Sequence, residues 1–192
     1  RILGRQAAFA YGRGALEEAA QRYEQMRNLA AAHIPDSLEH ASALANGAMV
    51  AAERGHLAAA RRDYERALEL RRRVSGRSQM IATDLMTLAE IENRLGDLDA
   101  ARTHLDEARQ RLAELDSRSE LHVGALVKLA QIDYDRGDSD AAQALFEQAK
   151  ALAEELPFEC ACKAQTLIWL SWFQLRAGQP QAALAGYQRA ID

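Results

Sequence analysis

The stretch VAAERGHLAAARRDYERA, residues 50–67, aligns with four other segments of this chain without an insertion or a deletion. The other copies are FAYGRGALEEAAQRYEQM at 9–26, IENRLGDLDAARTHLDEA at 91–108, IDYDRGDSDAAQALFEQA at 132–149 and FQLRAGQPQAALAGYQRA at 173–190. One glycine in each copy marks the period of 41 residues: Gly14, Gly55, Gly96, Gly137 and Gly178. Such self-similarity is typical of proteins whose units cannot bury their apolar faces alone and must stack on neighbours.

The residue types around each glycine predict two helices joined by a tight turn. An alanine stands five residues after it (Ala19, Ala60, Ala101, Ala142, Ala183) and a ring or leucine nine after it (Tyr23, Tyr64, Leu105, Phe146, Tyr187). Apolar residues precede it by five positions (Phe9, Val50, Ile91, Ile132, Phe173) and leucines by eleven (Leu3, Leu44, Leu85, Leu126, Leu167). Spacings of three and four residues define one face of an α-helix, and the small residues let a second helix approach. Because glycine accepts a left-handed backbone at the least cost, we expect the turn there.

Helix starts are also visible in the sequence. Asp36 precedes Glu39 by three residues, and Ser117 precedes Glu120 at the same spacing. This is the spacing of a capping box, which satisfies free amide groups at the start of a helix. Pro157 stands where a first helical turn tolerates proline. With no strand-like alternation in the sequence, we predict an all-α protein of paired helices.

These repeats resemble the tetratricopeptide repeat (TPR) family over the whole chain. The resemblance implies a right-handed α-solenoid of about five helix-turn-helix units, hinged at the five glycines, and we expect residues 1–192 to form one such solenoid. The common TPR period is about 34 residues, whereas the period here is 41 and the usual closing proline is missing. The longer period resembles the arrays of MalT-like bacterial regulators and, less closely, kinesin light chains. We also expect the chain to be part of a longer protein.

Composition argues against several classes of function. The net charge of −4 disfavours nucleic-acid binding, because phosphate binding needs a concentrated positive surface. The basic cluster of Arg71, Arg72, Arg73 and Arg77 is interpreted as cations at a helix end. No apolar run is long enough to span a membrane, and the first ten residues do not resemble a signal peptide. We therefore expect a soluble, cytoplasmic protein without a membrane partner.

No catalytic, cofactor or metal motif is found in the sequence. The five histidines never pair with acidic residues in a zinc-ligand pattern, and the dispersed glycines form no phosphate-binding loop. Cys160 and Cys162 are the only cysteines. If both lie on a helix, this spacing points their thiols to different faces, so a structural role is favoured over a redox or metal role. We expect no enzyme activity, no cofactor and no metal.

The TPR resemblance implies a concave groove lined by the first helix of each pair. Transferred to this sequence, the groove positions that we select as candidate contacts are Met49, Met86, Glu90, Asn93, Gln131, Tyr134, Trp169 and Trp172. The carboxylate clamp by which some TPR proteins hold a chaperone tail is not matched, since only Lys128 and Asn46 are suitable. Tryptophan and tyrosine are common anchors at interfaces, which favours a protein or peptide ligand.

Two of these candidates have an alternative interpretation. In WLSWFQL, residues 169–175, Leu170 and Phe173 occupy positions that are apolar in the other repeats and are expected in the core. Trp169 and Trp172 occupy positions where other repeats are polar or carry methionine, so these rings either contact a ligand or pack against a further repeat. The preferred function is a non-catalytic binding scaffold. The alternatives are an effector-binding sensory domain of a MalT-like ATP-dependent bacterial transcription regulator, or a regulatory arm of a signalling enzyme or protease.

Overall fold

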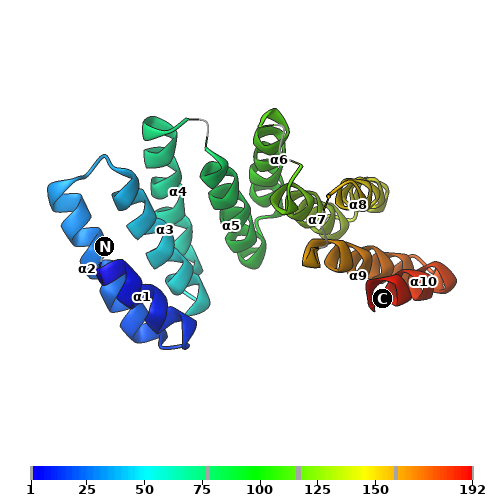
Figure 1. Ribbon diagram of the computed structural model, residues 1–192, viewed down its shortest axis with the longest axis horizontal. Helices are drawn as coiled ribbons and strands as arrows, with labels where there is room; N and C mark the ends of the chain where they lie inside the picture. Colours follow the sequence, from blue (N-terminus) through cyan, green and yellow to red (C-terminus); the bar gives the residue numbers. More distant parts are fainter. Residues whose placement is uncertain (1, 77, 116–117, 158–159, 192) are drawn as a thin grey trace. The chain divides into compact units, whose positions relative to one another are not determined.

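A computed structural model describes residues 2–76, 78–115, 118–157 and 160–191. Within these ranges the chain forms ten α-helices and no strand (Figure 1). They are α1 (Ile2–Gly12), α2 (Leu16–His33), α3 (Leu38–Glu53), α4 (Leu57–Val74), α5 (Gln79–Leu95), α6 (Leu98–Glu114), α7 (Glu120–Asp135), α8 (Ser139–Glu154), α9 (Ala161–Arg176) and α10 (Pro180–Ile191). The predicted all-α fold is confirmed.

The helices group into two compact units, Arg1–Asp97 and Leu98–Asp192. In the first unit α1 packs on α2, α2 on α3, α3 on α4 and α4 on α5. In the second unit α6 packs on α7, α7 on α8, α8 on α9 and α9 on α10, and α7 also contacts α9. Packing between helices that follow each other in sequence is the arrangement expected of stacked helical hairpins.

The turns lie at the predicted glycines. Gly14, Gly55, Gly96, Gly137 and Gly178 have φ angles between 76° and 87°, a left-handed conformation that other residues adopt only at a cost. Backbone amides after the turn donate back to the helix before it; the N–H of Asp138, for example, donates to the carbonyl of Asp133 at 2.8 Å. These bonds satisfy carbonyls that the end of a helix leaves free.

The alanine positions are buried where the helices pack. Ala19, Ala60, Ala101 and Ala142 have no exposed surface, and Ala183 is 2% exposed. In the second unit Ala142 belongs to a core cluster with Phe146 and Phe173, and in the first unit Ala19 packs with Tyr23 and Val50. Leu170 and Phe173 are buried, so their predicted core placement is also confirmed.

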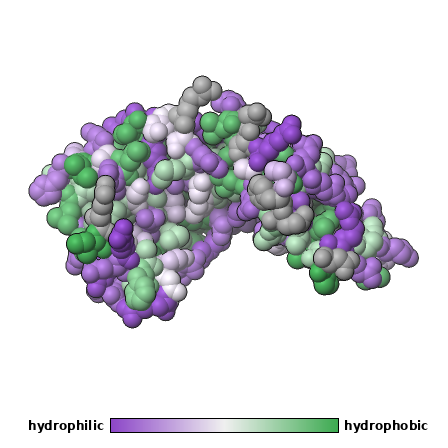
Figure 2. Space-filling model, in the orientation of Figure 1, coloured by the Kyte–Doolittle hydropathy of each residue, from purple (hydrophilic) through white to green (hydrophobic). Residues whose placement is uncertain are grey.

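Phe9 departs from its repeat position, because its side chain is 74% exposed. Its equivalent Val50 packs against residues of α2, in the hairpin before its own, whereas α1 is the first helix that the structure describes. Other exposed apolar residues include Ile2 and Ile191. Figure 2 shows the visible face as a mixture of hydrophilic surface and small separate hydrophobic patches. None of the described helices combines the length and hydropathy needed to cross a bilayer.

The helix caps differ from the predicted ones. Ser37, not Asp36, caps α3 by accepting a hydrogen bond from the backbone N–H of His40. Ser119 caps α7 in the same way, while Ser117 lies outside the described residues. The spacing rule placed the caps too early, because a cap requires an extended backbone at one particular residue, and that residue is the serine next to the helix.

Charged side chains join successive hairpins in each unit. Arg61 Nη2 on α4 lies 3.3 Å from Glu92 Oε1 on α5, and Arg102 Nε on α6 lies 2.6 Å from Asp133 Oδ1 on α7. Both acidic side chains are almost fully buried. The two pairs occupy equivalent positions, one 41-residue period apart, so the same ionic contact links hairpins in both units.

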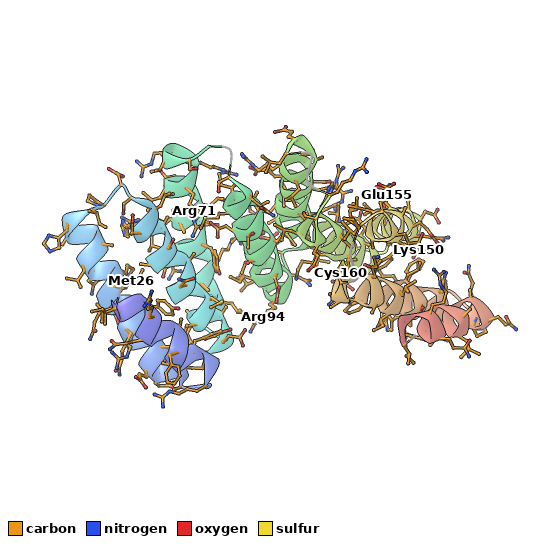
Figure 3. The ribbon with its side chains drawn as sticks, in the orientation of Figure 1. Met26, Arg71, Arg94, Lys150, Glu155 and Cys160 are labelled. Atoms are coloured by element: carbon orange, nitrogen blue, oxygen red, sulfur yellow. A yellow bond between two sulfur atoms is a disulfide. The ribbon has the colours of Figure 1, made fainter. Side chains whose placement is uncertain are left out.

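Arg71 does not behave as an exposed cation at a helix end. Its side chain, labelled in Figure 3, is buried, and its Nε lies 2.9 Å from Asp84 Oδ2. The interpretation of the basic cluster therefore holds for the exposed Arg72 and Arg73 but is wrong for Arg71, because α5 packs against the last turn of α4 and supplies a carboxylate. Arg77 lies outside the described residues.

Candidate functional site

A groove between α7 and α9 is the candidate binding site of the second unit. It encloses a cavity of about 290 Å³. The residues that line it recur every three or four positions on each helix, as expected when one face of each helix points into the groove. They are Glu120, Val123, Gly124, Val127, Lys128 and Gln131 of α7, with Ala161, Cys162, Gln165, Thr166 and Trp169 of α9.

The groove combines an apolar floor with polar side chains. Val123 and Val127 are buried and form part of the floor. Lys128 and Gln131 from α7 and Gln165 from α9 are half-buried or exposed, and supply hydrogen-bonding groups. Concave sites that bind small ligands or peptide side chains usually combine apolar walls with a few polar groups that orient the ligand. The groove has this chemical character.

A cluster of aromatic rings continues from Trp169, which lines the cavity. The ring centroids of Trp169 and Trp172 are 5.9 Å apart, and those of Trp172 and Tyr134 are 5.1 Å apart, both in edge-to-face geometry. Tyr134 also meets the buried Phe173 at 5.9 Å. Edge-to-face pairs at these separations are favourable. The two tryptophans are therefore held in place by the core on one side and remain partly exposed on the other.

Arg176 adds a fixed positive charge to this cluster. Its Nε donates a hydrogen bond to Tyr134 Oη at 3.3 Å. This bond raises the pKa of Arg176 above its ordinary value, and an arginine side chain is already charged at neutral pH. Arg176 was not among the predicted contacts, because it bonds to a residue 42 positions away that the spacing along one helix does not indicate.

The candidate residues of the second unit come together in the structure. Gln131 and Trp169 line the cavity from opposite helices, and Tyr134 and Trp172 are in ring contact beside it. The groove also contains residues that were not predicted as contacts: Glu120, Cys162, Gln165 and Thr166. Their spacing from Gln131 and Trp169 along one helix face could have indicated them.

The candidates of the first unit lie on two helices, Met49 on α3 and the other three on α5. Met49 and Asn93 are half-buried and Glu90 is exposed. Met86 is only 7% exposed. Its repeat equivalent in the second unit, Val127, is also 7% exposed, so both positions are buried and Met86 is not an open contact.

The two cysteines correct a prediction. Cys160 and Cys162 form a disulfide, whereas their spacing on a helix predicted thiols on different faces. That expectation was wrong because α9 begins only at Ala161, and Cys160 precedes it in extended backbone with φ −138° and ψ 150°. The two sulfurs and a carboxylate oxygen of Glu120 lie within 4.8 Å of one another.

Hairpins of 41 residues, each hinged at a left-handed glycine and packed through buried alanines, define a helical-repeat protein of the TPR class. The family model described as MalT-like TPR region matches residues 2–190, and the chain belongs to this family. The predicted family resemblance is thereby confirmed. Among curated proteins, none matches the sequence.

Solved structures of several helical-repeat proteins are similar to this chain. BtubC (BKLC) from P. vanneervenii is 25% identical, with a TM-score of 0.83 over 96% of this chain and 75% of that one. The TPR-like repeats of a kinesin light chain from Podosopora anserina are 17% identical, with a TM-score of 0.87 over 100% of this chain and 92% of that one. The Rap conjugation gene regulator of plasmid pLS20, solved with the Phr* peptide, is 14% identical, with a TM-score of 0.74 over 98% of this chain and 51% of that one.

Proposed function

We propose that this chain is a non-catalytic, cytoplasmic scaffold that binds a peptide or an extended segment of a partner protein in the groove between α7 and α9. The observation that carries the proposal is the pair of partly exposed tryptophans, Trp169 and Trp172, beside a cavity with an apolar floor and polar rim. Tryptophan is among the residues that contribute most binding energy at interfaces, because a large rigid ring loses little conformational entropy on binding.

The lining residues suit an extended peptide. The amides of Gln131 and Gln165 can each donate to and accept from a peptide backbone, while Val127 and Trp169 offer apolar surface for a side chain. The complex of the Rap regulator with the Phr* peptide supports this proposal, since a protein of the same fold holds a peptide. In the first unit, Met49, Glu90 and Asn93 have exposed surface, and we propose that they contact the same class of ligand.

Family membership supports a second candidate function. The MalT-like TPR match favours a sensory domain of a larger bacterial regulator, in which the groove would hold a small effector. Both candidate functions would use the same cavity, so the chemical class of the ligand that binds there distinguishes them.

Intrinsic fluorescence offers a direct test, because the only two tryptophans of the chain both lie at the groove. Peptides selected from a displayed library of random linear sequences should shift the tryptophan emission on titration. The Gln131→Ala and Trp172→Ala variants should weaken binding while far-UV circular dichroism stays unchanged.

Ile168→Ala is the matched control. Ile168 neighbours Trp169 on α9 but is exposed and does not line the cavity, so binding should be retained. Equal affinity in all three variants would contradict the proposed site. A shift with small metabolites but with no peptide would support the effector-binding function instead.

A further inference from the structure

Cys160 stands where the other repeats have a helix-capping serine. The residues that precede α3, α5, α7 and α9 fall 41 positions apart and all have extended backbone: Ser37, Ser78, Ser119 and Cys160. Each of the three serines accepts a hydrogen bond from a backbone N–H in the first turn, whereas Cys160 makes no side-chain cap hydrogen bond. Helix capping therefore does not explain a cysteine at this position.

The disulfide does not explain it either. A structural disulfide stabilises mainly by closing a loop of the unfolded chain, and the effect grows with the length of the loop. Cys160 and Cys162 are separated by one residue, so their bond closes a minimal ring and connects no two helices. Because neither helix capping nor loop closure explains the cysteine pair, we look to the reactivity of the two sulfurs toward redox partners and metals.

A third metal-binding group lies beside them. Glu120 is the first residue of α7, and its carboxylate lies within 4.8 Å of both sulfurs. Thiolates and a carboxylate are ordinary ligands of Zn²⁺, and in a tetrahedral zinc site such atoms are about 3.6 Å apart. The two sulfurs are bonded in the disulfide and would separate to about this distance after reduction, whereas the Glu120 carboxylate already lies within 4.8 Å of them.

Electrostatics favour a cation among these groups once the disulfide is open. Both cysteines lie at the start of the 16-residue helix α9, where the helix dipole favours thiolates. Two thiolates and the Glu120 carboxylate this close would repel one another, and a divalent cation between them removes the repulsion. Thiolates also prefer soft or borderline metals to Mg²⁺ or Ca²⁺.

We propose that Cys160, Cys162 and Glu120 form a redox-gated site for a thiophilic divalent cation such as Zn²⁺. In the oxidised form described here, no thiolate is present to bind a metal. A dithiol reductant supplies two electrons and two protons, which cleave the S–S bond to two thiols while the reductant becomes a disulfide. The metal then displaces both thiol protons and leaves its fourth tetrahedral position to water.

Cobalt titration tests the proposal, because Co²⁺ replaces Zn²⁺ and its thiolate bonds give a charge-transfer absorption. Protein reduced with a phosphine should bind one Co²⁺ per chain with this absorption, and Zn²⁺ should displace it. Oxidised protein should bind none. Absence of one-to-one uptake by the reduced protein, or equal uptake by the oxidised protein, would overturn the site.

Variants test each ligand. Cys160→Ser restores the capping residue of the other repeats, so it should fold normally while losing the charge-transfer band, and Cys162→Ser should lose it too. Glu120→Gln should weaken metal affinity by about tenfold or more. Asp140→Asn is the matched control, since Asp140 is an exposed carboxylate in the first turn of α8. This variant should bind the metal as tightly as the wild-type protein. A Glu120→Gln protein with unchanged affinity, or metal binding that survives loss of both cysteines, would refute the proposed ligands.

Discussion

Arg71 and Asp84 form an ion pair inside the first unit, with Arg71 Nε 2.9 Å from Asp84 Oδ2 and the two side chains 6% and 8% exposed. Arg71 Nη2 also reaches Ser42 Oγ at 3.4 Å. One period later, the equivalent residues are Leu112 and Ala125, both fully buried. The same place in the repeat thus holds a charge pair in one unit and an apolar pair in the other.

Removal of one partner of this pair should destabilise the protein strongly. Asp84→Ala would leave Arg71 buried without a counter-charge, and we expect a loss of about 3–5 kcal/mol in the free energy of unfolding. The double variant Arg71→Leu with Asp84→Ala copies the second unit and should be close to wild type or more stable. Urea denaturation followed by circular dichroism measures both. A double variant as unstable as Asp84→Ala would contradict this account.

The pair should also make stability depend on pH. Burial raises the pKa of Asp84 from 3.8 to about 6, against the lowering effect of Arg71. Between these values the folded state binds more protons than the unfolded state, so stability should fall as pH rises from about 4 to about 6. The difference in unfolding free energy between wild type and the Leu/Ala double variant isolates this contribution. Parallel pH profiles for the two proteins would rule it out.

Ala142 should not tolerate a larger side chain. It has no exposed surface and packs with Phe146 and Phe173, so Ala142→Leu should overpack the core and cost about 1–3 kcal/mol. Ala144 lies on the same helix but is exposed, and Ala144→Leu serves as the control with little expected change. Thermal or urea unfolding compares them, and equal stability of the two variants would be inconsistent with close packing at Ala142.

Substitution of Gly137 should also destabilise the protein, through backbone strain and not through overpacking. Its φ is +87°, and an added Cβ would meet nothing within 4 Å, so Gly137→Ala should cost about 1–2 kcal/mol through backbone strain alone. Gly12 lies at the end of α1, also with free space for a Cβ but without a positive φ. Gly12→Ala should leave the unfolding free energy unchanged or raise it slightly. The reverse order of stabilities would contradict the proposed cause.

The repeat pattern could be predicted from the sequence, because each of its features depends on residues that lie close together in the chain. Glycine at Gly137 and alanine at Ala142 are required by a left-handed turn and by a close helix approach, and both requirements recur in every unit. The caps were less predictable. Asp36 and Ser37 are both good capping residues, and only the backbone conformation selects Ser37.

The groove was predictable in part. Gln131 and Trp169 were selected from the groove positions that the TPR resemblance implies, and both line the cavity between α7 and α9. The contact between Tyr134 and Trp172 and the hydrogen bond from Arg176 join different helices. Their geometry depends on how α7 and α9 pack, which the spacing within one helix does not specify.

The amino-acid sequence by itself determined the helical hairpins, their 41-residue period, their glycine hinges and their alanine contacts, because each follows from periodicity and the conformational preferences of single residues. The tertiary structure alone decided that Arg71 is buried against Asp84, and that Cys160 and Cys162 meet beside Glu120. Two of these contacts join residues on different helices, and the disulfide depends on the residue at which α9 begins. The ion pair and the contact of Glu120 with the sulfurs therefore form only when the helices pack, whereas the disulfide forms because Cys160 lies just before α9 in extended backbone.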